Sequence, residues 1–209
     1  MTAEGALTLD RGLALLQAVA DAGGDAATIS ELAATIGASR AAVYRLLVPL
    51  SARGLVRRDG NKVRLSVGVL RLAGQVLPQL REAARPVLRA LAEKAEATAH
   101  LSLAEGDHVE AVVVVEPSST DVHVAYRVGT RQPIGAGAAG KALSLKQEGR
   151  GWVTSSGDVA RGVVSLAAPV RGVPALKASV GVLSLGPVRA EVTGPQVVAA
   201  AIALTGALK

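Results

Sequence analysis

The first third of the chain carries three short patterns of apolar residues at helical spacing, separated by turns that contain glycine. Asp10 can cap a first helix of about a dozen residues, and the glycine pair at 23–24 ends it. Thr28 and Glu31 form a capping box, in which each side chain accepts a hydrogen bond from the backbone N–H of the other residue. This box predicts the start of a second helix, which Gly37 ends.

A third helix and a hairpin are predicted next. Ser39 is a good N-cap, and the apolar residues between Val43 and Leu50 form a stripe with the spacing i, i+3, i+4 and i+7. Pro49 lies inside this helix, where it removes a backbone hydrogen bond, so we expect a kink or early fraying there. Two alternating runs, 55–58 and 62–66, are joined by Asp-Gly-Asn, a strong hairpin signal. Three helices before a hairpin is the order of a winged helix–turn–helix.

The hydrophobic period changes from helical to alternating in the second half of the chain. Helical spacing continues from residue 67 to 80, and Pro86 suits the first turn of another helix that reaches about residue 98. Beyond it we expect strands at 99–104, 109–116, 122–128, 163–170 and 176–185, a short helix at 138–145 and a closing helix at 195–208. The second half is therefore predicted to be an α+β domain around a mainly antiparallel sheet.

Basic side chains are concentrated on the predicted third helix and hairpin. Residues 40–71 hold eight Lys or Arg and one Asp, a balance of 8 − 1 = +7, whereas the whole chain carries +6, so the remainder sums to −1. Such clustering on one motif indicates a nucleic-acid partner. One Trp, two Tyr and no Phe argue against an aromatic platform for stacking single-stranded bases, so the expected partner is double-stranded DNA.

The remaining composition restricts the chemistry and the location. The chain has no Cys, which excludes disulfides, cysteine nucleophiles and thiolate metal sites. Its start lacks the basic residues and apolar core of a signal peptide, and the longest apolar run, near 197–204, is too short to span a bilayer. Nothing places His100, His108 and His123 on one face, and no nucleophile, base or carboxylate pair has catalytic spacing. We expect a cytoplasmic protein without metal, cofactor, membrane partner or enzymatic activity.

The predicted helix–turn–helix has the residues that its geometry requires: Ala33 where the helices cross, Gly37 in the turn and Val43 where the second helix packs back. The chain resembles the isocitrate lyase regulator (IclR) family of bacterial transcription factors along almost its full length. The segments that carry the resemblance are LDRGLALLQAVA, ISELAATIGASRAAVYRLLVPLSARGLV, LSVGVLRLAG, ARPVLRALAEKAEATAHLSLAEGDHV, RVGTRQPIGAGAAGKAL, VVSLAAPVRG and LKASVGVLSLGP. Their order and spacing are more specific than any single segment.

The resemblance implies both an organisation and a function. It implies a winged helix–turn–helix DNA-binding domain at 1–66, a linker helix at 67–80 and an effector-binding regulatory domain at 81–209 that is similar to GAF or PAS folds. It also implies transcription regulation by homodimers, often paired as homotetramers on an operator, under the control of a small-molecule effector. A DNA-binding protein whose C-terminal domain only oligomerises is an alternative.

The third helix is expected to read the DNA. With its apolar stripe facing inward, Ala41 and Arg45 point outward, flanked by Arg40 and Tyr44, and the N-terminal end of the helix should enter the major groove. Arg40 is the first candidate for a bidentate contact with guanine, worth about 1–3 kcal/mol of discrimination. The hairpin and the starts of the helices should bind the phosphate backbone of the DNA. The residues expected at the DNA are Arg11, Thr28, Ser30, Ser39, Arg40, Ala41, Tyr44, Arg45, Arg58, Asn61 and Lys62, with Arg53 and Arg71 as solvated bystanders.

The segment from Gly135 to Ala142 fits the G-x-G-x-x-G pattern and, up to its last position, a phosphate-binding loop. Ala142 stands where such a loop needs a Ser or Thr to hold magnesium, no buried parallel strand leads into the segment, and no βαβ unit follows it. A nucleotide-binding enzyme that uses Gly135–Lys141 is therefore an alternative that the sequence disfavours.

The family resemblance gives this glycine-rich segment another role, as a loop and short helix beside the effector pocket. Gly135 and Gly137 replace a His and a Thr of the family pattern, Ser165 replaces a frequent Cys, and the chain from 145 to 163 is shorter than in relatives. Backbone N–H groups near 136–138 could hold a carboxylate, so an organic acid is one candidate effector. The alternative is that the glycines only allow tight packing. The residues expected at the effector are Ile134, Gly135, Ala136, Gly137, Ala138, Ser165, Ala167 and Ser179.

Overall fold

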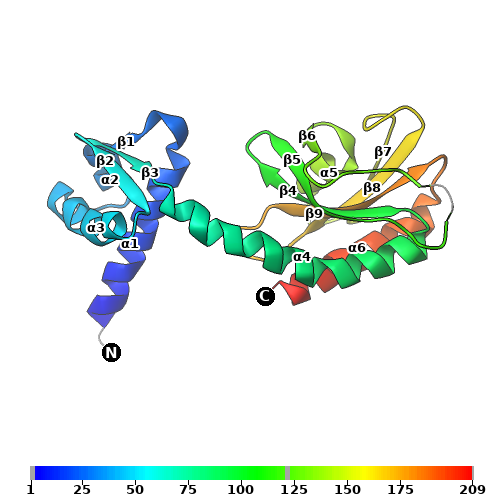
Figure 1. Ribbon diagram of the computed structural model, residues 1–209, viewed down its shortest axis with the longest axis horizontal. Helices are drawn as coiled ribbons and strands as arrows, with labels where there is room; N and C mark the ends of the chain where they lie inside the picture. Colours follow the sequence, from blue (N-terminus) through cyan, green and yellow to red (C-terminus); the bar gives the residue numbers. More distant parts are fainter. Residues whose placement is uncertain (1–2, 121–122, 209) are drawn as a thin grey trace. The chain divides into compact units, whose positions relative to one another are not determined.

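The computed structural model describes residues 3–120 and 123–208, which form two compact units, 1–76 and 77–209. The first unit is a winged helix–turn–helix (Figure 1). Its elements are α1 (Ala3–Asp21), the 3-10 helix η1 (Gly23–Asp25), β1 (Ala27–Thr28), α2 (Ile29–Thr35), α3 (Arg40–Ala52), β2 (Val56–Asp59) and β3 (Lys62–Leu65). The helix α4 (Gly68–Ala95) begins at the end of this unit and continues into the second.

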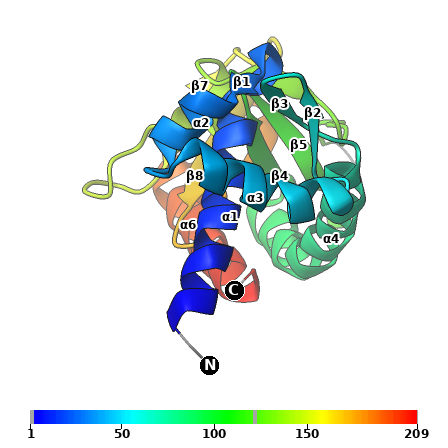
Figure 2. The ribbon, with the colours of Figure 1, turned by 90° about the vertical axis from the view of Figure 1, so that its left-hand side faces the viewer.

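The three helices of the first unit enclose an aliphatic core and are joined to a small sheet. Figure 2 looks onto α3 with α1 behind it, and both helices bury leucine or valine in the core, among them Leu15 and Val43. The strands pair antiparallel in the order β1-β3-β2. The predicted capping box of α2 and the Ser39 cap of α3 are both confirmed. Gly37, in the turn between them, has φ +61°, a conformation that glycine adopts without strain.

The predicted cap of α1 and the early fraying expected at Pro49 were both wrong. Asp10 does not cap α1 but lies inside it, because the helix already begins at Ala3 and nothing between these residues interrupts it. The chain also continues in helical form past Pro49 to Ala52 instead of fraying. Proline removes only its own N–H, and packing of the Leu47 face holds the last turn in place. The sequence signals also missed β1, which has only two residues.

The two helices predicted at 67–80 and from Pro86 are a single helix, α4, which includes Pro78 and Pro86. Its buried positions Leu80, Ala84 and Leu88 follow a spacing of four and pack on the second core. This tertiary packing compensates for the backbone hydrogen bonds that the two prolines remove.

The second unit is built on a six-stranded antiparallel sheet with the order β6-β5-β4-β9-β8-β7. Figure 1 shows α4 and α6 on one face of the sheet and α5 on the other. Leu88, Leu101, Leu166 and Leu204 belong to the main core, between the sheet and α4 and α6. The elements are β4 (Thr98–Glu105), β5 (His108–Val115), β6 (Arg131–Pro133), α5 (Gly137–Leu143), β7 (Val153–Ser156), β8 (Val163–Val170), β9 (Ala178–Leu185) and α6 (Ala190–Ala207).

The predicted α+β class and antiparallel sheet are confirmed, with differences at the sheet edges. No strand forms over 123–128, and residues 121–122 of the predicted strand lie outside the described residues. The Thr98 hydroxyl donates a hydrogen bond to the Val124 backbone oxygen. The short strand β6 pairs with β5 at the edge of the sheet. The edge strands β6 and β7 were not predicted because they are only three and four residues long. Among the described residues, no helix is long and apolar enough to cross a membrane.

Candidate functional site

The predicted recognition helix, α3, presents its polar side to solvent. It buries Val43 and Leu47 in contact with the other helices of the unit. Its first turn carries no acidic residue, so the positive end of the helix dipole and Arg40 act in the same direction. This arrangement favours a negatively charged partner at the start of the helix. The residues exposed on the outer side are Arg40, Ala41, Tyr44 and Arg45.

The hairpin lies against the recognition helix through one cationic contact. The Arg58 guanidinium carbon is 5.4 Å from the centre of the Tyr44 ring, which is a cation–π distance. At the hairpin tip, the Asn61 backbone oxygen accepts a hydrogen bond of 2.9 Å from the Ile29 N–H, at the start of α2. Lys62 is exposed beside Asn61. The structure therefore brings together the predicted residues of α3, of the hairpin and of the α2 start.

The hydroxyl groups at the helix starts are engaged as caps. Thr28 Oγ1 accepts from the Glu31 N–H at 3.2 Å, and Ser39 Oγ accepts from the Ala42 N–H at 3.2 Å. The backbone N–H of Thr28, followed by its hydroxyl, holds the pKa of Glu31 below its usual value. The Ser39 hydroxyl, which caps by accepting, keeps its own hydrogen as a donor that a phosphate oxygen can accept. Ser30 is exposed in the first turn of α2.

Arg11, which was predicted to contact DNA, lies apart from this cluster. Val48, an exposed residue of α3, was not predicted. Arg11 is exposed on α1, and no hydrogen bond or ion pair between described residues joins it to α3 or the hairpin. Val48, which was not predicted, is 68 % exposed on α3, one turn after Tyr44. The signal that identifies Val48 is its spacing of i+3 from Arg45 and i+7 from Ala41, because residues at these spacings share one side of a helix.

The predicted effector residues lie on the face of the sheet that α5 covers. Ala138, Ala142 and Ala167 form a small apolar cluster there. Because side chains alternate along a strand, the Ser165 and Ser179 side chains share this face, opposite the main core. Gly140 permits the close approach of α5, since a Cβ at this position would lie 2.1 Å from the Ile134 backbone oxygen.

Side chains of the protein itself occupy the hydrogen-bonding groups at the start of α5. Asp158 Oδ2 accepts hydrogen bonds from Lys141 Nζ at 2.6 Å and from the Gly137 N–H at 3.4 Å. The Ser155 hydroxyl also donates to this carboxylate. The hydrogen bond from Lys141, followed by that from Ser155, lowers the pKa of Asp158 to about 2, so it stays ionised near neutral pH. Asp158 was missed by the sequence analysis because it lies in an irregular segment, 17 residues from Lys141.

The backbone donors predicted to be free at the start of α5 are therefore engaged. Gly137 N–H donates to Asp158, and Ala138 N–H donates to Ser165 Oγ at 3.2 Å. Lys141, which a phosphate-binding loop would direct at a nucleotide, is paired with Asp158 as well. Gly137 and Ala138 are buried, Ile134 and Ala136 are half-buried, and Gly135 is exposed. The geometry thus disfavours nucleotide binding at this loop.

The three histidines have separate environments. His100 is buried on β4, with Nδ1 3.0 Å from Ser102 Oγ. His108 pairs with the adjacent Asp107, and His123 lies 3.2 Å from Glu116. In the part of the chain that the structure describes, no group of three His, Asp or Glu residues could hold a metal ion.

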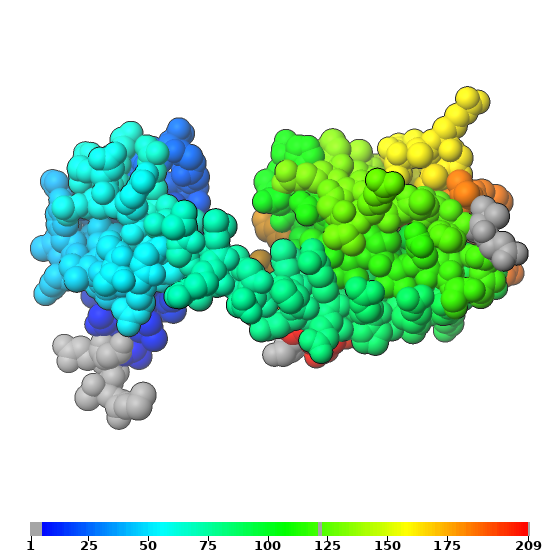
Figure 3. Space-filling model, in the orientation of Figure 1, coloured from blue at the N-terminus to red at the C-terminus, as the bar shows by residue number. Residues whose placement is uncertain are grey.

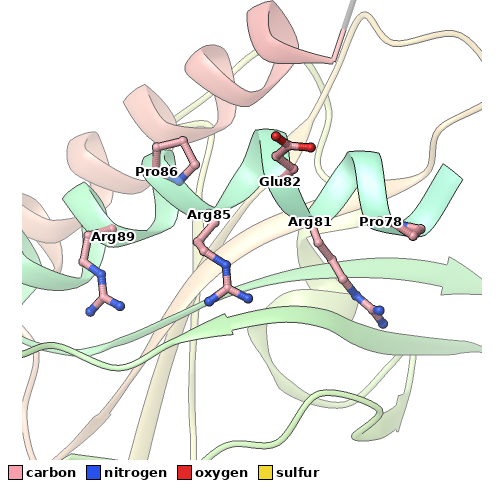
Figure 4. Close-up of a pocket in the computed structure, with 6 residues that line it drawn as sticks. All are labelled: Pro78, Arg81, Glu82, Arg85, Pro86 and Arg89. Atoms are coloured by element: carbon pink, nitrogen blue, oxygen red, sulfur yellow. The ribbon is translucent and has the colours of Figure 1, made fainter. Parts of the chain in front are cut away.

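A groove on α4 is lined only by residues of that helix, among them three arginines spaced by four (Figure 4). Figure 4 shows the three arginines pointing to one side of the helix and Glu82 pointing away from them. Arg81 Nε donates to the Val112 backbone oxygen at 3.0 Å, and an Arg89 amino group donates to that of Glu116 at 2.9 Å. Two of the three arginines therefore fasten α4 to β5 and to the residue that follows it.

A winged helix–turn–helix with a basic recognition surface, followed by an α+β sensor-like domain, defines the class of bacterial transcriptional regulators with two domains. The IclR helix-turn-helix domain model matches residues 8–60, and the model for the bacterial transcriptional regulator IclR C-terminal domain matches residues 76–150. The chain belongs to the IclR family, and its C-terminal domain is somewhat short. The IclR family is a family of transcriptional regulators and not of enzymes.

Individual relatives agree with the family. The HTH-type transcriptional regulator BhcR of Paracoccus denitrificans is 33% identical over 148 residues, which are 66% of this chain and 50% of BhcR. The chain spans about half the length of the curated relatives it matches.

Solved structures show the same fold over nearly the whole chain. An IclR-family regulator from Rhodococcus sp. has a TM-score of 0.59 at 20% identity, covering 98% of this chain and 96% of that one. An IclR homolog from Microbacterium hydrocarbonoxydans, solved with 4-hydroxybenzoate, has a TM-score of 0.54 at 20% identity, covering 96% and 98%.

Proposed function

We propose that this chain is a sequence-specific DNA-binding transcriptional regulator whose C-terminal domain binds a small-molecule effector. The observation that carries the proposal is the exposed basic surface formed by α3 and the hairpin, joined by the Tyr44–Arg58 contact. α3 enters the major groove with its N-terminal end, where Arg40 contacts a base. Arg45 and Tyr44 contact bases or phosphate from the next turn.

The other exposed residues set the position of the protein on the duplex. Backbone contacts fix register and orientation without reading sequence. Lys62 and Arg58 neutralise phosphate at the hairpin, and Val48 adds an apolar contact at the far end of α3. The residues assigned to the phosphate backbone are Arg11, Thr28, Ser30, Ser39, Arg58, Asn61 and Lys62, with Ala41 packed beside the bases.

The regulator acts as a homodimer. On α1, Leu9 and Leu13 are 65% and 56% exposed and lie one turn apart, and Leu70, at the start of α4, is 70% exposed. Figure 3 shows the first turns of α4 at the surface of the molecule. Exposed leucines of this kind on a small domain are candidates for a site of association. Twofold symmetry would place two recognition helices on half-sites about one DNA turn, or a multiple of it, apart.

Dimerisation is tested by changing one of these exposed leucines. Leu13→Asp places a charge in the proposed interface and should shift the sedimentation coefficient from dimer to monomer. Ala14→Asp is the matched control, because the neighbouring position points about 100° away around the helix. Equal effects of both substitutions, or no effect of Leu13→Asp, would contradict the assigned interface.

The effector binds on the α5 face of the sheet, bordered by Ile134–Ala138, Ser165, Ala167 and Ser179. The support is the buried polar character of this face, where Ser165 and Ser179 lie among small residues. Ligand binding alters DNA affinity only when the ligand binds one arrangement of the dimer more tightly than another. Titration of ligands against operator binding tests this step, and a complete absence of response would favour a C-terminal domain that only oligomerises.

The DNA-binding proposal is tested by selecting bound duplexes from a random pool with the full chain. A defined motif is expected, and Arg40→Ala should lose the preference at one position of each half-site. Arg53→Ala is the matched control, since Arg53 is a basic residue at the end of α3 whose side chain donates to the Pro49 backbone oxygen. Failure to enrich any motif refutes the function, and an unchanged motif with Arg40→Ala refutes the recognition-helix assignment.

A further inference from the structure

The groups that would hold a negatively charged effector at the start of α5 are already used by the chain itself. Asp158 accepts hydrogen bonds from Lys141 Nζ and from the Gly137 N–H. Ser165 Oγ accepts the hydrogen bond of the Ala138 N–H. A ligand carboxylate brought here would meet the negative charge of Asp158 instead of free donors, and two adjacent carboxylates disfavour each other's ionised form.

The adjoining part of the same sheet face is polar but carries no charge. Ser102 on β4 and Ser179 on β9 are paired positions, and His100 lies two residues before Ser102. All three are buried, and burial lowers the pKa of His100 to about 4, so its ring is neutral at pH 7. Among the residues that the structure describes, no Asp, Glu, Lys or Arg is buried. A charged ligand enclosed here would therefore lack a counter-charge, and an unpaired buried charge is costly.

One polar group on this face has no partner. Ser179 is 0% exposed, and its Oγ makes no hydrogen bond to any described residue. A buried hydroxyl without a partner loses free energy that a ligand with a matching donor or acceptor restores. Ser179 is thus the group on this face that most needs a ligand.

The histidine is fixed close to this serine. Gly181, two residues after Ser179, faces His100, and a Cβ at Gly181 would lie 2.9 Å from His100 Nε2. The absent side chain at Gly181 therefore leaves room for the imidazole. The ring of Tyr126 lies over His100, with the ring centres 5.5 Å apart. Tyr126 comes from a segment that forms no strand, so its ring can move without breaking a sheet ladder.

We propose that the effector is an uncharged molecule with hydroxyl, carbonyl or amide groups, recognised by Ser179 with His100 and Ser102. The inference rests on the proposed effector-binding function and names its ligand class. Because the Tyr126 ring lies against His100, a ligand that reaches His100 displaces this ring as it enters.

The test measures the affinity of the full chain for matched acids and amides by isothermal titration calorimetry. The probes are 4-hydroxybenzoate with 4-hydroxybenzamide, and lactate with lactamide. For at least one pair the amide should bind at least about tenfold more tightly than the acid, since one well-placed hydrogen bond in place of an unpaired charge has this effect. Tighter binding of the acid in both pairs, or no binding by any of the four compounds, overturns the inference.

One substitution tests Ser179 itself. Ser179→Ala should weaken amide binding about fivefold or more, whereas Ser184→Ala, further along β9, should leave it unchanged. Equal losses of amide affinity in the two variants would contradict the role given to Ser179.

The wild-type comparison of acid with amide does not depend on how well any variant folds. Melting temperatures of the variants show whether a lost affinity reflects a lost fold. DNA binding, measured on the same samples, separates the two claims. Sequence-specific DNA binding together with a preference for acids refutes only the ligand class, whereas the absence of any sequence preference on DNA refutes the proposed function.

Discussion

The salt dependence of DNA binding should separate the residues that read bases from those that hold phosphate. The proposed interface assigns three cations in each protomer to phosphate, Arg11, Arg58 and Lys62, and counting Arg45 with them gives four, while Arg40 contacts a base. Each neutralised phosphate contributes about 0.9 to the slope of log affinity against log salt, so a dimer with eight such contacts should have a slope of about −7. Its affinity should then fall roughly 10⁴-fold between 50 and 200 mM salt.

Lys62→Ala removes one phosphate contact per protomer and should make the slope shallower by about 1.8 in the dimer, on every DNA sequence alike. Arg40→Ala should leave the slope nearly unchanged and instead reduce the preference for operator over other DNA by about 1–3 kcal/mol per half-site. Fluorescence anisotropy with operator and scrambled duplexes at four or more salt concentrations measures both effects, with Arg53→Ala as the control. Equal slopes for wild type and Lys62→Ala, or equal losses on both duplexes with Lys62→Ala and Arg40→Ala, would refute the division of roles.

Three further predictions concern the folded state. Thr28→Ala, which breaks the capping box of α2, should lower the free energy of unfolding by about 1 kcal/mol, as measured by unfolding in urea. Thr28→Ser keeps a capping hydroxyl and should retain most of this stability. Leu88→Ala, in the fully buried seam of α4, should cost about 2–5 kcal/mol, while Ile202→Ala at a 68% exposed site should stay within about 0.5 kcal/mol. The lowered pKa of Asp158 means that its bond to Lys141 stabilises the fold above pH 3.8 and is lost as pH falls toward about 2. NMR titration of this carboxyl group should give a midpoint near 2, and a midpoint at 3.8 or higher would show that the contact is not formed.

Much of the fold followed from local signals in the sequence. The Thr28–Glu31 box, the Ser39 cap and the Asp-Gly turn at 59–60 each determine a structure within a few residues, and all three features are present. The long strands β8 and β9 are rich in apolar residues because they are buried in the core of the second unit. Signals of this kind involve residues that are close together in the sequence, so they can be recognised from one sequence alone.

The errors arose where tertiary contacts overrule local preference. Pro86 suggested the start of a separate helix, but the buried face of α4 keeps one helix continuous through both Pro78 and Pro86. At the α5 start, the glycines indicated free backbone donors, and only the folded structure reveals that Asp158 fills that place. Asp158 and Lys141 lie far apart in the sequence, and no periodicity connects a loop carboxylate to its partner.

The most direct test of the account is the ratio between the affinities of the full chain for its selected duplex and for a scrambled duplex of the same length at 150 mM salt. Specific recognition through α3 predicts a ratio of roughly 10³ or more, as is typical of operator-binding proteins. A ratio near one, with both affinities falling steeply in salt, would show that the basic surface binds DNA only through phosphates and would contradict the proposed recognition.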